Sequence, residues 1–123
     1  EKFPGFDVFA GTERYLLDVL KAGGVGTITA TGNVTVGGCA KVFSAWKAGS
    51  ADAEALQDQL TRERLTLQNY PAAAALKELL AKNSGKASWR NVRAPFMPLP
   101  ADKAASLVSE LDAVNFALPA KAA

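Results

Sequence analysis

The first third of the chain alternates between short apolar runs and one amphipathic stretch. The runs at 6–10 and 25–31 are rich in aromatic and β-branched residues, so each predicts a buried β-strand. Between them, Thr12 can serve as the N-cap of a helix that the glycines at 23–24 end. A strand, a helix and a second strand predict parallel pairing with a right-handed crossover, the building unit of doubly wound sheets and of (β/α)8 barrels.

After Asn33 the strand pattern does not recur, and the apolar residues take up helical spacing. The first helix predicted there has one apolar face, made of Cys39, Val42, Phe43 and Trp46. Gly49 is expected to end this helix, and Ser50 or Asp52 to cap the next one. The apolar stripe of that second helix consists of Leu56, Leu60 and Leu67.

Prolines set the limits of the remaining elements. Pro71 suits the first position of a third helix, which is expected to end near Gly85. Three prolines between 86 and 100 predict an extended connection. A last helix is predicted from about Ala101 to about Val114.

Two parallel strands make no independent sheet, because parallel strands are normally buried on both faces and three or more strands are needed for stability. The neighbouring strands are therefore expected either from missing parts of the same polypeptide or from a partner chain. The chain opens at Glu1 without an initiator methionine, as a segment cut from a longer polypeptide would. Removal of a leader or tag is the alternative interpretation.

Composition narrows the possible partners. A hydrophobic content of 49% and a charged content of 21% are ordinary for a globular domain. The net charge is +2 and the 14 basic residues are scattered, so no nucleic acid partner is expected. With Cys39 alone and no histidine, neither a disulfide nor a Cys/His metal site is expected, and a cytoplasmic location fits best. The apolar run at 6–10 is too short to span a bilayer, so no membrane partner is expected.

Candidate chemistry is expected where the strands end, because the reactive groups of parallel α/β folds collect at the C-terminal ends of the strands. Gly11, Thr12 and Glu13 follow the first strand, and residues 29–33 follow the second. Glu13 with Thr12 can bind the hydroxyl groups of a polar substrate. Alternatively, both residues cap the next helix and stabilise it by about 1 kcal/mol. Gly11 either lets a ligand approach the backbone or only permits the turn.

No catalytic residue is predicted in this chain. Without histidine there is no Ser–His or Cys–His pair. A lysine that forms a Schiff base must be desolvated, so that its amine is neutral near pH 7. Six lysines lie in predicted helices of mixed polarity, which favours solvated positions for their amines. They are Lys21, Lys41, Lys47, Lys77, Lys82 and Lys103.

The segment Phe6–Val34, with its order of strand, Gly-x-acid, helix, Gly-Gly, strand and Asn, resembles the dihydrodipicolinate synthase and N-acetylneuraminate lyase family of class I pyruvate-dependent aldolases. The helix after Pro71 and the run Val92–Leu99 resemble the C-terminal helices and the Arg-x-Pro connection of that family. The resemblance implies an α/β fold, the C-terminal portion of a (β/α)8 TIM barrel. Residues 1–48 would form the last two βα units, and residues 49–123 a C-terminal helical extension.

The resemblance also implies that the catalytic groups lie outside this chain and that part of the substrate-binding wall lies within it. The lysine that forms an imine with pyruvate or another 2-keto acid, and its assisting tyrosine, would lie upstream of Glu1. Ile28 matches a position whose backbone lies against bound pyruvate, and Gly11 matches the glycine at the end of the seventh strand. Glu13, with Thr12 beside it, matches an acid that contacts the distal polyol in sialic-acid-cleaving members. Those members carry a second acid where this chain has Arg14.

Family membership would further imply an aldehyde as the second substrate, a homo-oligomer, and no cofactor or metal. On this reading the chain alone is inactive. A second hypothesis is a non-catalytic assembly or regulatory module that completes a barrel with another chain. A third is a self-standing helical binding domain with a small βαβ cap, whose strand edges would be exposed.

Overall fold

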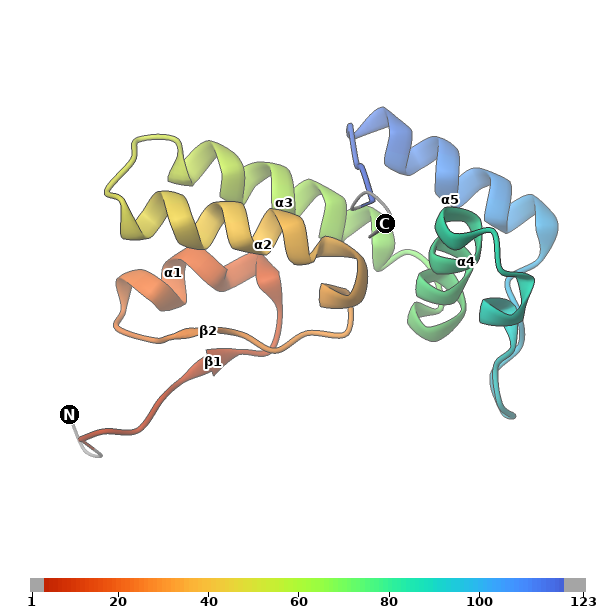
Figure 1. The fold of residues 1–123 in the computed structure, drawn as a ribbon, viewed down its shortest axis with the longest axis horizontal. Helices are drawn as coiled ribbons and strands as arrows, with labels where there is room; N and C mark the ends of the chain where they lie inside the picture. Colours follow the sequence, from red (N-terminus) through yellow and green to blue (C-terminus); the bar gives the residue numbers. More distant parts are fainter. Residues whose placement is uncertain (1–3, 119–123) are drawn as a thin grey trace.

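The computed structural model describes residues 4–118 as a small parallel strand pair beneath layers of helices (Figure 1). Helices α1, α2 and α3 are stacked on the strands, and α4 and α5 lie at the other end of the molecule. The elements in chain order are β1 (Phe9–Ala10), the 3-10 helix η1 (Glu13–Tyr15), α1 (Leu16–Lys21), β2 (Gly26–Thr27), α2 (Gly32–Lys47), α3 (Ala53–Leu67), α4 (Ala72–Ser84), the 3-10 helix η2 (Ala87–Arg90) and α5 (Ala101–Ala113).

The parallel pairing predicted for the two strands is confirmed. Phe9 lies opposite Gly26, and Ala10 lies opposite Thr27. The predicted length and burial of the strands are wrong for this chain. Only two residues of each run are paired, and Phe6 and Ile28 are 75% and 71% exposed. The reason is that no third strand flanks the pair in residues 4–118, so the outer edges lack a neighbouring strand and the face turned away from the helices lacks cover.

The helices largely follow the limits that glycine and proline predict. Helix α2 begins at Gly32 and ends at Lys47, and Gly49, which was predicted to end it, has φ +65°. Gly85 takes the left-handed conformation at the end of α4, which glycine adopts without steric cost. Pro71 lies one residue before the first residue of α4, because its ψ of 110° is not helical. The predicted α5 is confirmed to within one residue.

The predicted extended connection at 86–100 contains η2, which the sequence analysis missed. All three prolines of this connection follow η2, so none of them prevents a turn there. The Arg90 guanidinium donates two hydrogen bonds to the Glu78 carboxylate, at 2.7 and 2.8 Å, and thereby fastens η2 to α4. The Arg90 hydrogen bond is also the main reason why the pKa of Glu78 lies below its usual value.

Two apolar clusters hold the helices together. One joins α1, α2 and α3 through Leu16, Leu17, Leu20, Val42, Ala53 and Leu60. The other joins α4 and α5 to the first turn of α2 and the last of α3 through Val34, Leu67, Ala75, Leu76, Leu79, Leu107 and Leu111. Helices α2 and α3 contribute to both clusters, although the predicted domain division at residues 48 and 49 falls between them; that division stays a prediction. Among residues 4–118, no helix has both the length and the apolar character needed to cross a membrane.

Candidate functional site

A cavity of about 220 Å³ lies beside the C-terminal ends of the two strands. Gly11 reaches it from the end of β1, and Thr29 and Thr31 from the segment after β2. Arg64 contributes from α3 and Tyr70 from the turn that leads to α4. The cavity therefore lies where the order of the strands predicts a site in a parallel α/β fold.

Glu13 does not line this cavity but holds two of the residues that do. Its side chain is 0% exposed, and its carboxylate accepts hydrogen bonds from Thr29 Oγ1 at 2.8 Å, from Thr35 Oγ1 at 3.1 Å and from Thr31 Oγ1. A buried carboxylate is costly unless donors or a cation compensate it. Here the hydroxyl groups of Thr29 and Thr31 do so, together with that of Thr35, whose single hydrogen is shared with Thr31 O at 3.0 Å. Because Thr29 and Thr31 direct their hydrogens at Glu13, the free lone pairs of their oxygens are left to accept hydrogen bonds from a ligand.

Arg64 supplies the positive charge of this wall. Its Nε lies 3.7 Å from Glu13 Oε2. This Nε is buried and has no hydrogen-bond partner among residues 4–118. The same guanidinium makes a long hydrogen bond to Gln68 Oε1, at 3.4 Å. The wall thus combines a cation that is incompletely satisfied with two hydroxyl acceptors, a set of groups suited to the oxygen atoms of a polar ligand.

Arg64 was not predicted as a site residue, although the sequence of α3 contains a signal for it. Glu63 and Arg64 fall between Leu60 and Leu67, on the stripe that was predicted to be apolar. Glu63 is buried and Arg64 is half-buried. Charged residues inside an apolar stripe require buried partners, and they can therefore mark a site.

The structure places the four predicted substrate-binding residues differently from one another. Gly11 lines the cavity, whereas Glu13 lies behind the threonines that line it. Thr12 is half-buried and caps η1, because its Oγ1 accepts a hydrogen bond from the Arg14 amide at 3.4 Å. Ile28 lies on the exposed face of the strand pair, and its amide donates to Ala10 O at 2.9 Å. The capping role considered for Thr12 is therefore present, while Glu13 serves a network instead of a cap.

Gln57, a residue of α3, links this helix to Glu13, Arg14 and the start of α1. Its Oε1 accepts a hydrogen bond from the Leu17 amide at 3.0 Å, and its Nε2 donates to Glu13 O at 3.0 Å and to Arg14 O at 3.1 Å. The first amides of a helix have no partner within the helix, so a side chain from α3 satisfies the start of α1. This contact fixes the position of Glu13 relative to Arg64.

Tyr70 offers a test of the far side of the cavity. Burial, followed by the hydrogen bond that its hydroxyl donates to Glu110 at 2.8 Å, raises the pKa of Tyr70 to about 12. A raised pKa means that the folded state holds its proton longer than the unfolded state does. This stabilising contribution is thus complete below pH 10.0, the usual value, and is lost as the pH rises towards about 12.

We expect the difference in phenolate absorbance between the wild type and Tyr70→Phe to develop only near pH 12. A difference that is complete near pH 10.0 would contradict the hydrogen bond between Tyr70 and Glu110.

Other reactive groups in residues 4–118 lack the environment that catalysis requires. The lysines are exposed, except for the half-buried Lys77, which donates to Asn91 O. Burial raises the pKa of the Cys39 thiol, which disfavours the reactive thiolate. No three His, Cys, Asp or Glu side chains in this range lie close enough together to hold a metal ion. The expectation that the protein needs no metal stays a prediction.

Solved structures share this fold. The chain is 27% identical to YagE, a prophage protein from E. coli K12 solved in complex with pyruvate, with a TM-score of 0.81 over 93% of this chain and 39% of YagE. Dihydrodipicolinate synthase DapA-2 from Bacillus anthracis is 22% identical, with a TM-score of 0.76 over 89% of this chain and 37% of its own. For N-acetylneuraminate lyase from Proteus mirabilis the identity is 20% and the TM-score 0.73, over 91% and 38% of the two chains. The chain thus spans less than two fifths of the length of each.

These similarities confirm the predicted fold class, an α/β chain that corresponds to the C-terminal portion of a (β/α)8 barrel with added helices. Comparison with the curated proteins gives no significant match. The model of one protein family matches residues 1–114, nearly the whole chain. The chain belongs to the dihydrodipicolinate synthetase family.

Proposed function

We propose that the whole protein is an imine-forming lyase or aldolase, which acts on pyruvate or another 2-keto acid together with an aldehyde. This chain supplies one wall of its pocket and the helices that support that wall. The observation that carries the proposal is the family match over residues 1–114, together with a polar cavity at the C-terminal ends of the parallel strands. The pyruvate bound in the YagE structure supports the choice of substrate class.

The imine lysine and the tyrosine that assists it lie outside this chain in our proposal. An amine must lose its proton to attack a carbonyl carbon, and burial is what favours the neutral amine. The exposed lysines described here do not meet that requirement; Lys21, for example, pairs with Glu54 at the surface. The chain alone is therefore expected to be inactive, and neither a metal nor a cofactor is needed because the imine itself withdraws electrons.

The second substrate contacts the cavity beside β1 and β2. Gly11 allows close approach of the backbone, Thr29 and Thr31 accept hydrogen bonds from its hydroxyl groups, and Arg64 donates to its oxygen atoms. Glu13 acts on this substrate through the groups that it holds in place. Thr12 fixes the turn between Gly11 and Glu13, and the backbone of Ile28 lies against pyruvate.

The exposed faces of the strand pair support the partner proposals. Phe6, Val8 and Ile28 expose more than half of their surface, and exposed apolar strands with unpaired edges invite pairing with further strands. We propose that the other strands of the barrel cover this surface, and that the complete protein is a cytoplasmic homo-oligomer. The alternative is that another chain supplies those strands and that this chain has only an assembly role.

Reductive trapping tests the proposal. The full-length protein is treated with pyruvate and borohydride, which reduces an imine to a stable secondary amine, and the modified peptide is located by mass spectrometry. We expect one pyruvate adduct on a lysine outside residues 1–123, and no adduct without pyruvate. An adduct on a lysine of this chain, or no adduct at all, would overturn the proposal. If activity appears only when this chain is mixed stoichiometrically with another, the assembly role replaces it.

A further inference from the structure

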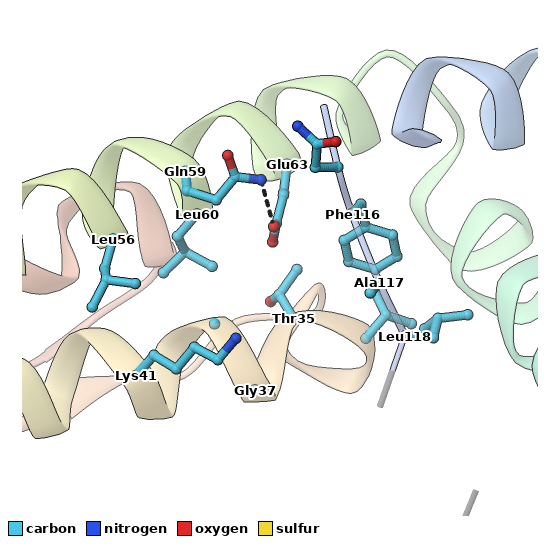
Figure 2. A pocket seen from close by; sticks show the side chains of 13 residues that line it. Thr35, Gly37, Lys41, Leu56, Gln59, Leu60, Glu63, Phe116, Ala117 and Leu118 are labelled. Atoms are coloured by element: carbon cyan, nitrogen blue, oxygen red, sulfur yellow. Dashed lines mark hydrogen bonds between the residues drawn. The ribbon is translucent and has the colours of Figure 1, made fainter. Parts of the chain in front are cut away.

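A second and larger cavity, of about 530 Å³, lies between α2 and α3 (Figure 2). Residues 115–118, which follow α5, close one side of it. This volume is within the range of small-molecule sites in proteins. The two cavities share no lining residue. Thr35 lines the larger one and also donates to Glu13, but the proposed function assigns no ligand to this second cavity.

Glu63 places a carboxylate inside this cavity. The residue is only 9% exposed, and its side chain projects from α3 towards α2 (Figure 2). Oε1 accepts a hydrogen bond from Gln59 Nε2 at 2.9 Å, and the same Gln59 nitrogen donates to Val114 O at 2.6 Å. Among residues 4–118, no cation lies within 4.0 Å of Glu63. A buried negative charge with one neutral donor lacks the compensation that such charges normally have.

Lys41 places the opposite charge at the same cavity. Its side chain projects from α2 (Figure 2). Gly38, one turn earlier on this helix, also lines the cavity. A Cβ built at Gly38 would lie 3.6 Å from Glu63 Oε2, so this glycine marks the point where α2 comes near the carboxylate. Lys41 forms no ion pair within the described part of the chain. Two opposite charges therefore face one cavity without contacting each other.

Apolar side chains form the rest of the wall. The larger ones come from α2, from α3 and from the segment after α5, and they are Val34, Leu56, Leu60, Phe116 and Leu118, while Thr35, Gln59 and Asn115 add polar groups to the lining. Such a wall favours an apolar body on the ligand. Gly37 also lines the cavity and leaves open space there, because a Cβ built at this position would meet no atom within 4 Å.

We propose that this cavity binds a free α-amino acid with an apolar side chain. The ammonium group of the ligand pairs with Glu63, its carboxylate pairs with Lys41, and its side chain packs against Phe116 and Leu118. A simple amine would leave Lys41 unpaired, and a simple carboxylic acid would leave Glu63 unpaired. Only a zwitterion satisfies both charges, which is why charge complementarity selects this class of ligand.

Calorimetric titration of the full-length protein with L-leucine tests the proposal. We expect saturable binding, and much weaker binding of isopentylamine and of isocaproate, which lack the carboxylate and the ammonium group respectively. Glu63→Gln and Lys41→Met should each weaken L-leucine binding by roughly tenfold or more, the factor expected for a lost charged hydrogen bond. Glu54→Gln and Lys47→Met are matched controls on the same two helices but outside the cavity, and they should leave the affinity unchanged.

Gly37→Leu keeps the test valid if Glu63→Gln fails to fold. Its side chain enters the open space of the cavity and should abolish L-leucine binding, while the melting temperature is maintained or raised because glycine is a poor residue for a helix interior. Three results would overturn the proposal. The first is that the wild-type protein shows no saturable binding of L-leucine. The second is that Gly37→Leu binds L-leucine as tightly as the wild type does. The third is that Lys41→Met binds isopentylamine more tightly than the wild type does and binds L-leucine with unchanged affinity. The last would mean that Lys41 competes with a cation for Glu63.

Discussion

Replacement of Glu13 by alanine is expected to lower the free energy of unfolding by roughly 3–5 kcal/mol, the range for breaking a buried ion pair by removing one partner. The substitution leaves the Arg64 guanidinium without its carboxylate and takes the shared acceptor away from Thr29, Thr31 and Thr35. It also opens a void at a site that is 0% exposed. Urea denaturation followed by circular dichroism measures the loss.

Two further variants make the Glu13 result interpretable. Glu54→Ala removes a carboxylate whose ion pair with Lys21 is exposed, and it should cost less than about 1 kcal/mol. Glu13→Gln keeps the size of the side chain and one oxygen acceptor but loses the charge, so the difference between Glu13→Ala and Glu13→Gln reports the void and the remaining hydrogen bonds together, without the charge. If Glu13→Ala costs no more than Glu54→Ala, the buried network does not support this part of the fold.

In the complete enzyme, Glu13→Gln distinguishes a role in positioning the second substrate from a role in imine formation. If Glu13 holds Thr29, Thr31 and Arg64 against the second substrate, Glu13→Gln should raise KM for the aldehyde and leave reductive trapping of pyruvate intact. Unchanged KM and kcat for every aldehyde would remove the role that we assign to Glu13. Loss of pyruvate trapping would instead indicate that the variant disturbs the whole barrel.

Replacement of Gln57 by leucine is expected to cost roughly 2–3 kcal/mol, although the two side chains are similar in size. Leucine cannot accept the hydrogen bond from the Leu17 amide, and it cannot donate to the carbonyl groups of Glu13 and Arg14. A buried amide without an acceptor loses its hydration and gains nothing in return. Thermal or urea unfolding of the variant measures this cost.

Asp58→Leu is the matched control for Gln57→Leu. Asp58 is the next residue of α3 and is exposed, and such surface substitutions usually change stability by less than about 0.5 kcal/mol. Equal effects of the two substitutions would show that Gln57 does not join α3 to the start of α1.

Much of the fold follows from local sequence signals. The end of α2 before Gly49, the end of α4 at Gly85 and the start of α5 at Ala101 are set by residues at those positions. Each glycine or proline acts through its own backbone preferences, which need no distant contact. The pairing of the two strands was also predictable, because a helix between two short apolar runs favours a parallel crossover.

The candidate site was predictable only in its location. Gly11 and the threonines after β2 were expected at the ends of the strands, and the cavity is lined by Gly11, Thr29 and Thr31. The burial of Glu13 was not predicted, because it depends on Arg64, which lies 51 positions further along the chain, and on threonines that follow the next strand.

The sequence by itself therefore determined the family, the order of helices and strands, and the edge of the sheet that carries the candidate site. Each of these follows from residue types and their spacing, which act locally or recur as a pattern. The tertiary structure alone decided that Glu13 is a buried anchor, that Gln57 holds the start of α1, and that Glu63 and Lys41 face one cavity. The physical reason is that burial and charge pairing arise between residues far apart in the sequence, whose distances are fixed only when the helices pack.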